Sequence, residues 1–94
     1  MRNRIPAEVF PPGEFLREEL ETRGWTQADL AELMGRPLRS INEIINGKKA
    51  ITAETAIGLG DAFGTSAEYW MNLESLYRLH VARGQKREIL RKAR

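Results

Sequence analysis

The chain has 94 residues, enough for one small domain with a single hydrophobic core. It contains no cysteine and only one histidine, His80, which excludes disulfides, cysteine-based metal sites and zinc sites built on several imidazoles. Residues 83–94 carry six basic side chains and one acidic one, whereas residues 1–82 have a formal net charge of −3, so the overall charge of +2 originates in the C-terminal segment.

The N-terminal segment is rich in proline and precedes the first predicted helix. Prolines within residues 6–12 disfavour helix at and before their own positions, so residues 1–11 are predicted to form an extended arm. A helix is then predicted from Pro12 or Gly13 to Gly24. Its apolar residues Phe15, Leu16 and Leu20 share one side, while Arg17, Glu18, Glu21 and Arg23 are expected to face outward.

Two short helices joined by a tight turn follow. Thr26 is suited to N-cap the first of them, and Gly35 is expected to end it in a left-handed conformation. The second begins near Pro37 and closes at Asn46-Gly47. Inward apolar stripes are predicted on both, formed by Leu30, Ala31, Leu33 and Met34 and by Leu38, Ile41, Ile44 and Ile45. This pattern is a helix-turn-helix, which is typical of DNA-binding proteins.

A fourth helix is predicted between Thr52, as its N-cap, and Gly64. Its inward residues are Ala56, Leu59 and Phe63. Gly58 and Gly60 lie inside it although glycine costs about 1 kcal/mol relative to alanine in a helix. We interpret these two glycines as points where another helix comes close.

The last predicted helix starts from a capping box formed by Thr65 and Glu68 and carries aromatic and apolar residues as far as His80. Past Gly84, the basic segment either begins another helix or stays mobile. Five helices and no convincing strand predict an all-α fold. The chain is expected to divide into an arm (residues 1–11), a helix-turn-helix domain (residues 12–83) and a basic C-terminal extension (residues 84–94).

The outward positions of the second helix of the pair carry residue types that read DNA bases. Arg39 can donate two hydrogen bonds to guanine and Asn42 has the amide geometry for adenine, each worth roughly 1–3 kcal/mol of discrimination. Glu43 either accepts a hydrogen bond from cytosine or forms an ion pair with Arg39 on the same helix. Candidates for phosphate contacts are Gln27, Arg36, Ser40, Lys48 and Lys49, of which Ser40 also suits a base. Taken singly, such residues more often form only a solvated helix face.

Several segments resemble the HigA family of antitoxins, within the lambda-repressor-like, Xre-type group of DNA-binding domains. The resemblance covers roughly residues 10–80, and its most specific motifs are Pro12-Gly13-Glu14-Phe15-Leu16-Arg17-Glu18-Glu19-Leu20 and Gly64-Thr65-Ser66-Ala67-Glu68-Tyr69-Trp70-Met71-Asn72-Leu73. It implies a five-helix, lambda-repressor-like fold and a homodimeric repressor that binds double-stranded operator DNA ahead of its own toxin–antitoxin genes. It also implies a partner, a small RelE-like ribonuclease toxin of the HigB type, which the antitoxin neutralises.

By position, the base contacts of the family fall on Leu38, Arg39, Asn42 and Glu43, supported by Gln27. Leu38 departs from the pattern, because many relatives carry a polar residue there. Two interpretations of this leucine stay open: contact with the methyl group of a thymine, or burial in the core.

The last helix is the best candidate for a dimer interface, which would place two reading helices about 34 Å apart. The candidate interface residues are Tyr69, Leu73, Leu76, Tyr77 and His80. For Trp70 and Leu73 the alternative is simple packing under the first and fourth helices. The toxin surface is not assigned, because the apolar arm residues Ile5, Val9 and Phe10 could face either a toxin or the last helix.

No cofactor, metal or catalytic function is expected, because the chain has no cysteine nucleophile, no glycine-rich phosphate loop and no acid partner for its lone histidine. Nothing resembles a signal peptide or the ~20 apolar residues of a membrane span, which predicts a cytoplasmic protein without a membrane partner. Two alternatives remain: a stand-alone Xre-type regulator without a toxin, and a protein–protein module that never touches DNA.

Overall fold

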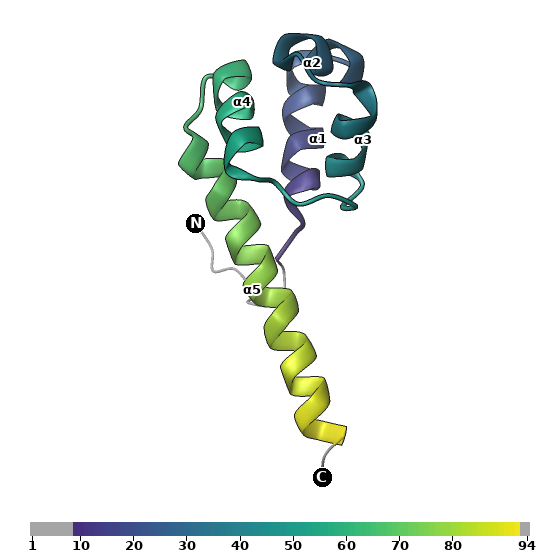
Figure 1. The fold of residues 1–94 in the computed structure, drawn as a ribbon, viewed down its shortest axis with the longest axis vertical. Helices are drawn as coiled ribbons and strands as arrows, with labels where there is room; N and C mark the ends of the chain where they lie inside the picture. The colour runs from purple at the N-terminus through teal and green to yellow at the C-terminus, as the bar shows by residue number, and fades with distance from the viewer. Residues whose placement is uncertain (1–8, 93–94) are drawn as a thin grey trace.

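The computed structural model describes the backbone of residues 9–92 and the side chains of residues 9–85, and most of the predicted arm lies outside this range. Five helices occur in it: α1 (Pro12–Arg23), α2 (Gln27–Met34), α3 (Leu38–Ile45), α4 (Ala53–Phe63) and α5 (Ala67–Lys92). No strand is present among residues 9–92, which confirms the all-α prediction. The four short helices form a compact head, and α5 leaves it below α4 and extends far beyond it (Figure 1).

Most helix ends follow from local sequence, as predicted. Thr26 Oγ1 accepts a hydrogen bond from the amide of Asp29 at 3.0 Å, and the Asp29 carboxylate accepts one from the amide of Thr26 at 2.9 Å, which completes a capping box. Gly35 ends α2 with a φ of 65°, a left-handed conformation that glycine adopts without a Cβ clash. Thr52 caps α4 by accepting from the amide of Thr55.

The predicted capping box at the start of α5 is wrong. Ser66, not Thr65, accepts the hydrogen bond from the amide of Tyr69, at 3.0 Å, so α5 begins at residue 67. Thr65 Oγ1 instead accepts from the indole Nε1–H of Trp70 at 2.9 Å. Because the Trp70 side chain is fully buried, its N–H needs a partner within the protein, and the Thr65 hydroxyl supplies it.

The core lies where all five helices meet. It consists of Leu16, Leu20, Leu30, Ala31, Ile41, Ile44, Ile45, Ile51, Ala56, Leu59, Phe63 and Trp70. Two residues predicted to face inward do not: Leu33 is 60% exposed and Leu38 is 51% exposed. Leu33 lies about 60° around the helix from Leu30, on the side away from Ala31, and Leu38 is the first residue of its helix, at the rim of the core.

Arg23 was expected to face outward, but it is half-buried and joins two helix ends. Its Nη2 donates to the carbonyl oxygen of Phe63, the last residue of α4, at 2.9 Å, and pairs with Glu19 at 3.3 Å. The guanidinium also lies over the rings of Trp25 and Phe63, 5.5 and 5.0 Å from their centroids. The side chain therefore attaches the end of α1 to the end of α4.

Close approaches explain the glycines within the helices. A Cβ at Gly58 would lie 2.8 Å from the terminal methyl of Met34 in α2, as the interpretation of a neighbouring helix requires. At Gly60 the neighbour is instead the backbone before α5, with the carbonyl oxygen of Thr65 at 2.8 Å. The tightest case was not predicted: a Cβ at Gly13 would lie 2.3 Å from the carbonyl oxygen of Ile45.

We expect Gly13→Ala to lower the free energy of unfolding by about 1–3 kcal/mol, because the added methyl overlaps the backbone of Ile45 and forces α1 and α3 apart. Gly84→Ala is the matched control, since a Cβ there meets nothing within 4 Å and alanine favours helix. Urea unfolding followed by circular dichroism measures both. A Gly13→Ala variant as stable as the wild type would contradict the close approach of α1 to α3.

The segment between α3 and α4 is attached to α5 by a buried carboxylate. Glu74 Oε1 accepts a hydrogen bond from the amide of Ile51 at 3.0 Å, and Oε2 accepts one from Arg78 Nε. Both Glu74 and Ile51 are buried. The start of α4 is thereby held beside α5.

Of the two alternatives for the basic segment, the helical one holds, but the segment extends α5 without a break past Gly84 instead of starting a new helix. The predicted boundary between domain and extension therefore falls inside α5. Among residues 9–92, α5 has the length to cross a membrane but is too polar to do so, and the other four helices are too short.

Candidate nucleic-acid interface

The turn between α2 and α3 sets the direction in which α3 presents its side chains. After Gly35, Pro37 takes an extended conformation (φ −62°, ψ 144°) as the N-cap of α3, and the amide of Arg36 donates to the carbonyl of Ala31. Ile41, Ile44 and Ile45 are buried beneath the helix. The opposite side of α3 is therefore the side that a DNA groove can reach.

The structure places the four predicted base-reading residues on or beside this outer side. Leu38, Arg39 and Asn42 are exposed, and Glu43 is half-buried. The exposure of Leu38 rules out the core interpretation of this leucine. Its contact with a thymine methyl stays a prediction.

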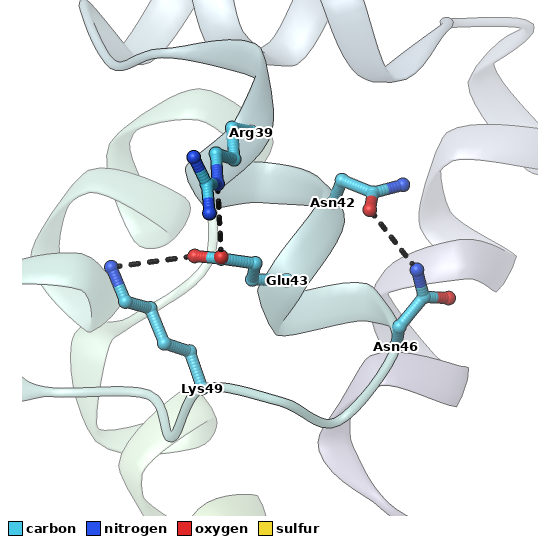
Figure 2. A network of polar contacts seen from close by, with 5 residues as sticks. All are labelled: Arg39, Asn42, Glu43, Asn46 and Lys49. Atoms are coloured by element: carbon cyan, nitrogen blue, oxygen red, sulfur yellow. Dashed lines mark hydrogen bonds and ion pairs between the residues drawn. The ribbon is translucent and has the colours of Figure 1, made fainter.

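A series of three hydrogen-bonded amide side chains connects the start of α2 with the C-terminal half of α3. Asn42 Nδ2 donates to Gln27 Oε1 at 3.3 Å, which brings together two residues that the sequence placed 15 positions apart. Asn46 Nδ2 donates to Asn42 Oδ1 at 3.1 Å (Figure 2). Asn46 was not among the predicted site residues, although its position one helical turn after Asn42 is a signal for contact.

Glu43 lies at the centre of a cluster of charges. Its Oε2 accepts from Arg39 Nε at 3.2 Å, and Lys49 Nζ lies 3.5 Å from its Oε1 (Figure 2). The ion pair that was one of two interpretations of Glu43 is therefore present. Lys49 comes from the segment after α3, so this carboxylate connects the helix to the chain that follows it.

The remaining phosphate candidates surround α3. Arg36 precedes it and pairs with Glu54, at the start of α4, at 3.4 Å. Ser40 is half-buried on the helix, and Lys48 follows it in an exposed position. The charged residues around α3 are four cations, Arg36, Arg39, Lys48 and Lys49, and two carboxylates, Glu43 and Glu54. This group has a net charge of +2, whereas the rest of the head is acidic.

The candidate dimer residues occupy different environments along α5. Leu73 is half-buried and packs against the core, and Trp70 lies wholly within it, as the alternative interpretation has it. Tyr69 and Leu76 are exposed, the latter to 60%, while Tyr77 and His80 are half-buried. Leu79 is a further exposed apolar residue, missed in the sequence although it lies three positions after Leu76.

Comparison with known proteins identifies the class. Residues 16–70, more than half of the chain, match the family described as Helix-turn-helix (HTH_3). The match spans α2, α3 and α4 in full, together with most of α1 and the first turn of α5. The fold and the exposed side of α3 thus define an Xre-type helix-turn-helix protein.

Individual relatives show to which family within this class the chain belongs. Antitoxin HigA-1 of Vibrio cholerae is 38% identical over 86 residues (90% of this chain, 78% of the relative), and Virulence-associated protein I of Dichelobacter nodosus is 38% identical over 89 residues (94% and 81%). The solved structure of Pseudomonas aeruginosa antitoxin HigA with the higBA promoter superposes with a TM-score of 0.82 at 36% identity (88% and 91%). The chain belongs to the HigA family of antitoxins, and none of these relatives is named as an enzyme.

Proposed function

We propose that this protein is a sequence-specific DNA-binding antitoxin that binds and represses the operator of its own toxin–antitoxin genes as a homodimer. The observation that carries the proposal is the outer side of α3, where Arg39 and Asn42 are exposed and Gln27 is joined to Asn42. The similarity to an antitoxin solved with its promoter supports the same conclusion. Binding of operator DNA implies action in the cytoplasm.

In the proposed complex, α3 enters the major groove with its N-terminal turns against base edges. The base-reading set is Leu38, Arg39, Asn42 and Glu43. The phosphate-binding set is Gln27, Arg36, Ser40, Lys48 and Lys49. Gln27 is suited to bind a phosphate because it lies at the start of α2, where backbone amides without a partner in the helix can bind an anion.

Dimerisation is proposed through Tyr69, Leu73, Leu76, Tyr77 and His80. The exposed apolar side chains of Leu76 and Tyr69 on a helix that extends away from the head support this interface. A two-fold dimer would place two α3 helices on half-sites about 34 Å apart along the DNA.

The proposed protein partner is a HigB-type, RelE-like ribonuclease toxin, which the antitoxin neutralises by forming a complex. Family membership supports this partner. Isolation of a stable complex with the protein encoded next to the gene, in which ribonuclease activity is lost, would separate an antitoxin from a stand-alone regulator.

Fluorescence anisotropy with the DNA upstream of the gene and with a scrambled duplex, each at two salt concentrations, tests the DNA-binding proposal. We expect the upstream DNA to bind at least about 10³-fold more tightly at physiological salt, the lower end of the usual specificity ratio. Equal, weak binding to both duplexes would contradict the repressor function and favour the protein–protein module.

A further inference from the structure

The contact between Arg39 and Glu43 uses one particular atom of the arginine. Arg39 donates to Glu43 through Nε, at 3.2 Å, and not through its terminal nitrogens. A guanidinium carries five N–H donors, so this contact leaves four of them, on the two Nη atoms, free for other partners. The Arg39 side chain is 87% exposed, which keeps these donors accessible from solvent.

The carboxylate that holds Arg39 is itself held from a second element. The Glu43 side chain is only 25% exposed, and its other oxygen lies 3.5 Å from Lys49 Nζ in the segment after α3 (Figure 2). The carboxylate is thus fixed by cations on both sides. An arginine attached to it loses part of the rotamer freedom that an exposed long side chain otherwise has.

We propose that Glu43 is a positioning residue for DNA recognition, which holds Arg39 by Nε so that its two Nη groups face the O6 and N7 acceptors of a guanine. The proposal rests on the proposed function and assigns a role to Glu43 other than accepting a hydrogen bond from cytosine. Guanine presents these two acceptors side by side in the major groove, and the arginine fork matches them. Arg39 can therefore read guanine without giving up its ion pair.

The same carboxylate disfavours binding to DNA that lacks the guanine. Non-specific binding depends on cations that neutralise phosphates. Glu43 forms ion pairs with two of the cations near α3, Arg39 and Lys49. Its own negative charge also repels a phosphate that approaches this part of the surface. Through Arg39, Glu43 thus supports the specific complex, while its charge weakens phosphate binding to either duplex by a common factor.

The test compares Glu43→Ala, Arg39→Ala and the double variant for binding to the upstream and scrambled duplexes. We expect Glu43→Ala to lower the affinity for the upstream duplex and to raise that for the scrambled duplex. The ratio of the two affinities should fall about tenfold, which is part of the discrimination that an arginine–guanine contact provides. Glu43→Gln keeps an oxygen for Arg39 Nε and is expected to retain part of the ratio. In the Arg39→Ala background, removing Glu43 is expected to leave the ratio unchanged.

Glu54→Ala is the matched control, because Glu54 pairs with Arg36 from α4 and its loss changes the net charge by the same amount. It is expected to change both affinities by one common factor. The inference would be overturned if Glu43→Ala left the ratio of upstream to scrambled affinity unchanged. It would also be overturned if removing Glu43 lowered this ratio equally in the Arg39→Ala background, because Glu43 would then read a base itself. If the wild type itself does not prefer the upstream DNA, the proposed function fails, and the inference with it.

Discussion

We expect the double substitution Arg39→Ala/Asn42→Ala to weaken binding to the upstream DNA by about 10²- to 10⁴-fold, because each residue is proposed to supply a bidentate base contact, worth roughly 1–3 kcal/mol. Binding to scrambled DNA is expected to change by no more than about fivefold, since it depends mainly on phosphate contacts. The fold is expected to stay intact because both side chains are exposed.

Anisotropy titrations of the wild type, both single variants and the double variant measure this loss. Arg17→Ala is a suitable control, because Arg17 is exposed on α1 and lies outside the proposed interface. Lys48→Ala offers a contrast: it should weaken binding to both duplexes alike and reduce the salt dependence by about one phosphate contact. If the double variant lost the same affinity for both duplexes, α3 would not be the element that reads sequence.

The largest effect on stability is expected from Trp70→Ala, which should lower the free energy of unfolding by about 3–5 kcal/mol. Trp70 is fully buried, its ring centroid lies 5.1 Å from that of Tyr69 and 5.8 Å from that of Phe63, and its indole N–H is bonded to Thr65. Removal of the ring leaves a cavity between α4 and α5 and breaks a hydrogen bond at their junction.

Urea unfolding followed by circular dichroism measures the loss without depending on tryptophan fluorescence. Trp25→Ala is the matched control, since Trp25 is only half-buried and should cost less. Thr65→Val removes only the hydroxyl that accepts from the indole, and we expect a loss of about 1 kcal/mol. A Trp70→Ala variant no less stable than Trp25→Ala would show that Trp70 does not hold α5 to the head.

The helices could be predicted from local sequence signals, whereas the contacts between distant segments could not. Thr26, Gly35 and Thr52 cap their helices as expected, because a cap depends on a few neighbouring residues. The cap of α5 was assigned to Thr65 because a sequence pattern does not reveal that the hydroxyl is needed by a buried indole. The exposure of Leu33 likewise depends on where the short α2 meets its neighbours.

The candidate site divides in the same way. Arg39 and Asn42 could be found from helical periodicity and residue type, since both follow from position on one helix. The ion pair of Lys49 with Glu43 could not be predicted, because it depends on how the chain turns after α3. Asn46 was overlooked although it lies one helical turn after Asn42. Gln27 was a candidate both from its position at the start of α2 and from the family resemblance, and its hydrogen bond from Asn42 brings it next to the candidate site.

The hydrogen bond from the Ile51 amide to Glu74 has a consequence for how an operator would be built. It attaches the chain just before α4 to α5, and α3 shares one core with both helices, so we expect the orientation of α3 relative to α5 to be constant within a protomer. In a dimer joined through α5, the distance between the two α3 helices then follows from the angle at which the two α5 helices cross. The number of base pairs between the half-sites of the operator is therefore a direct measure of that crossing angle.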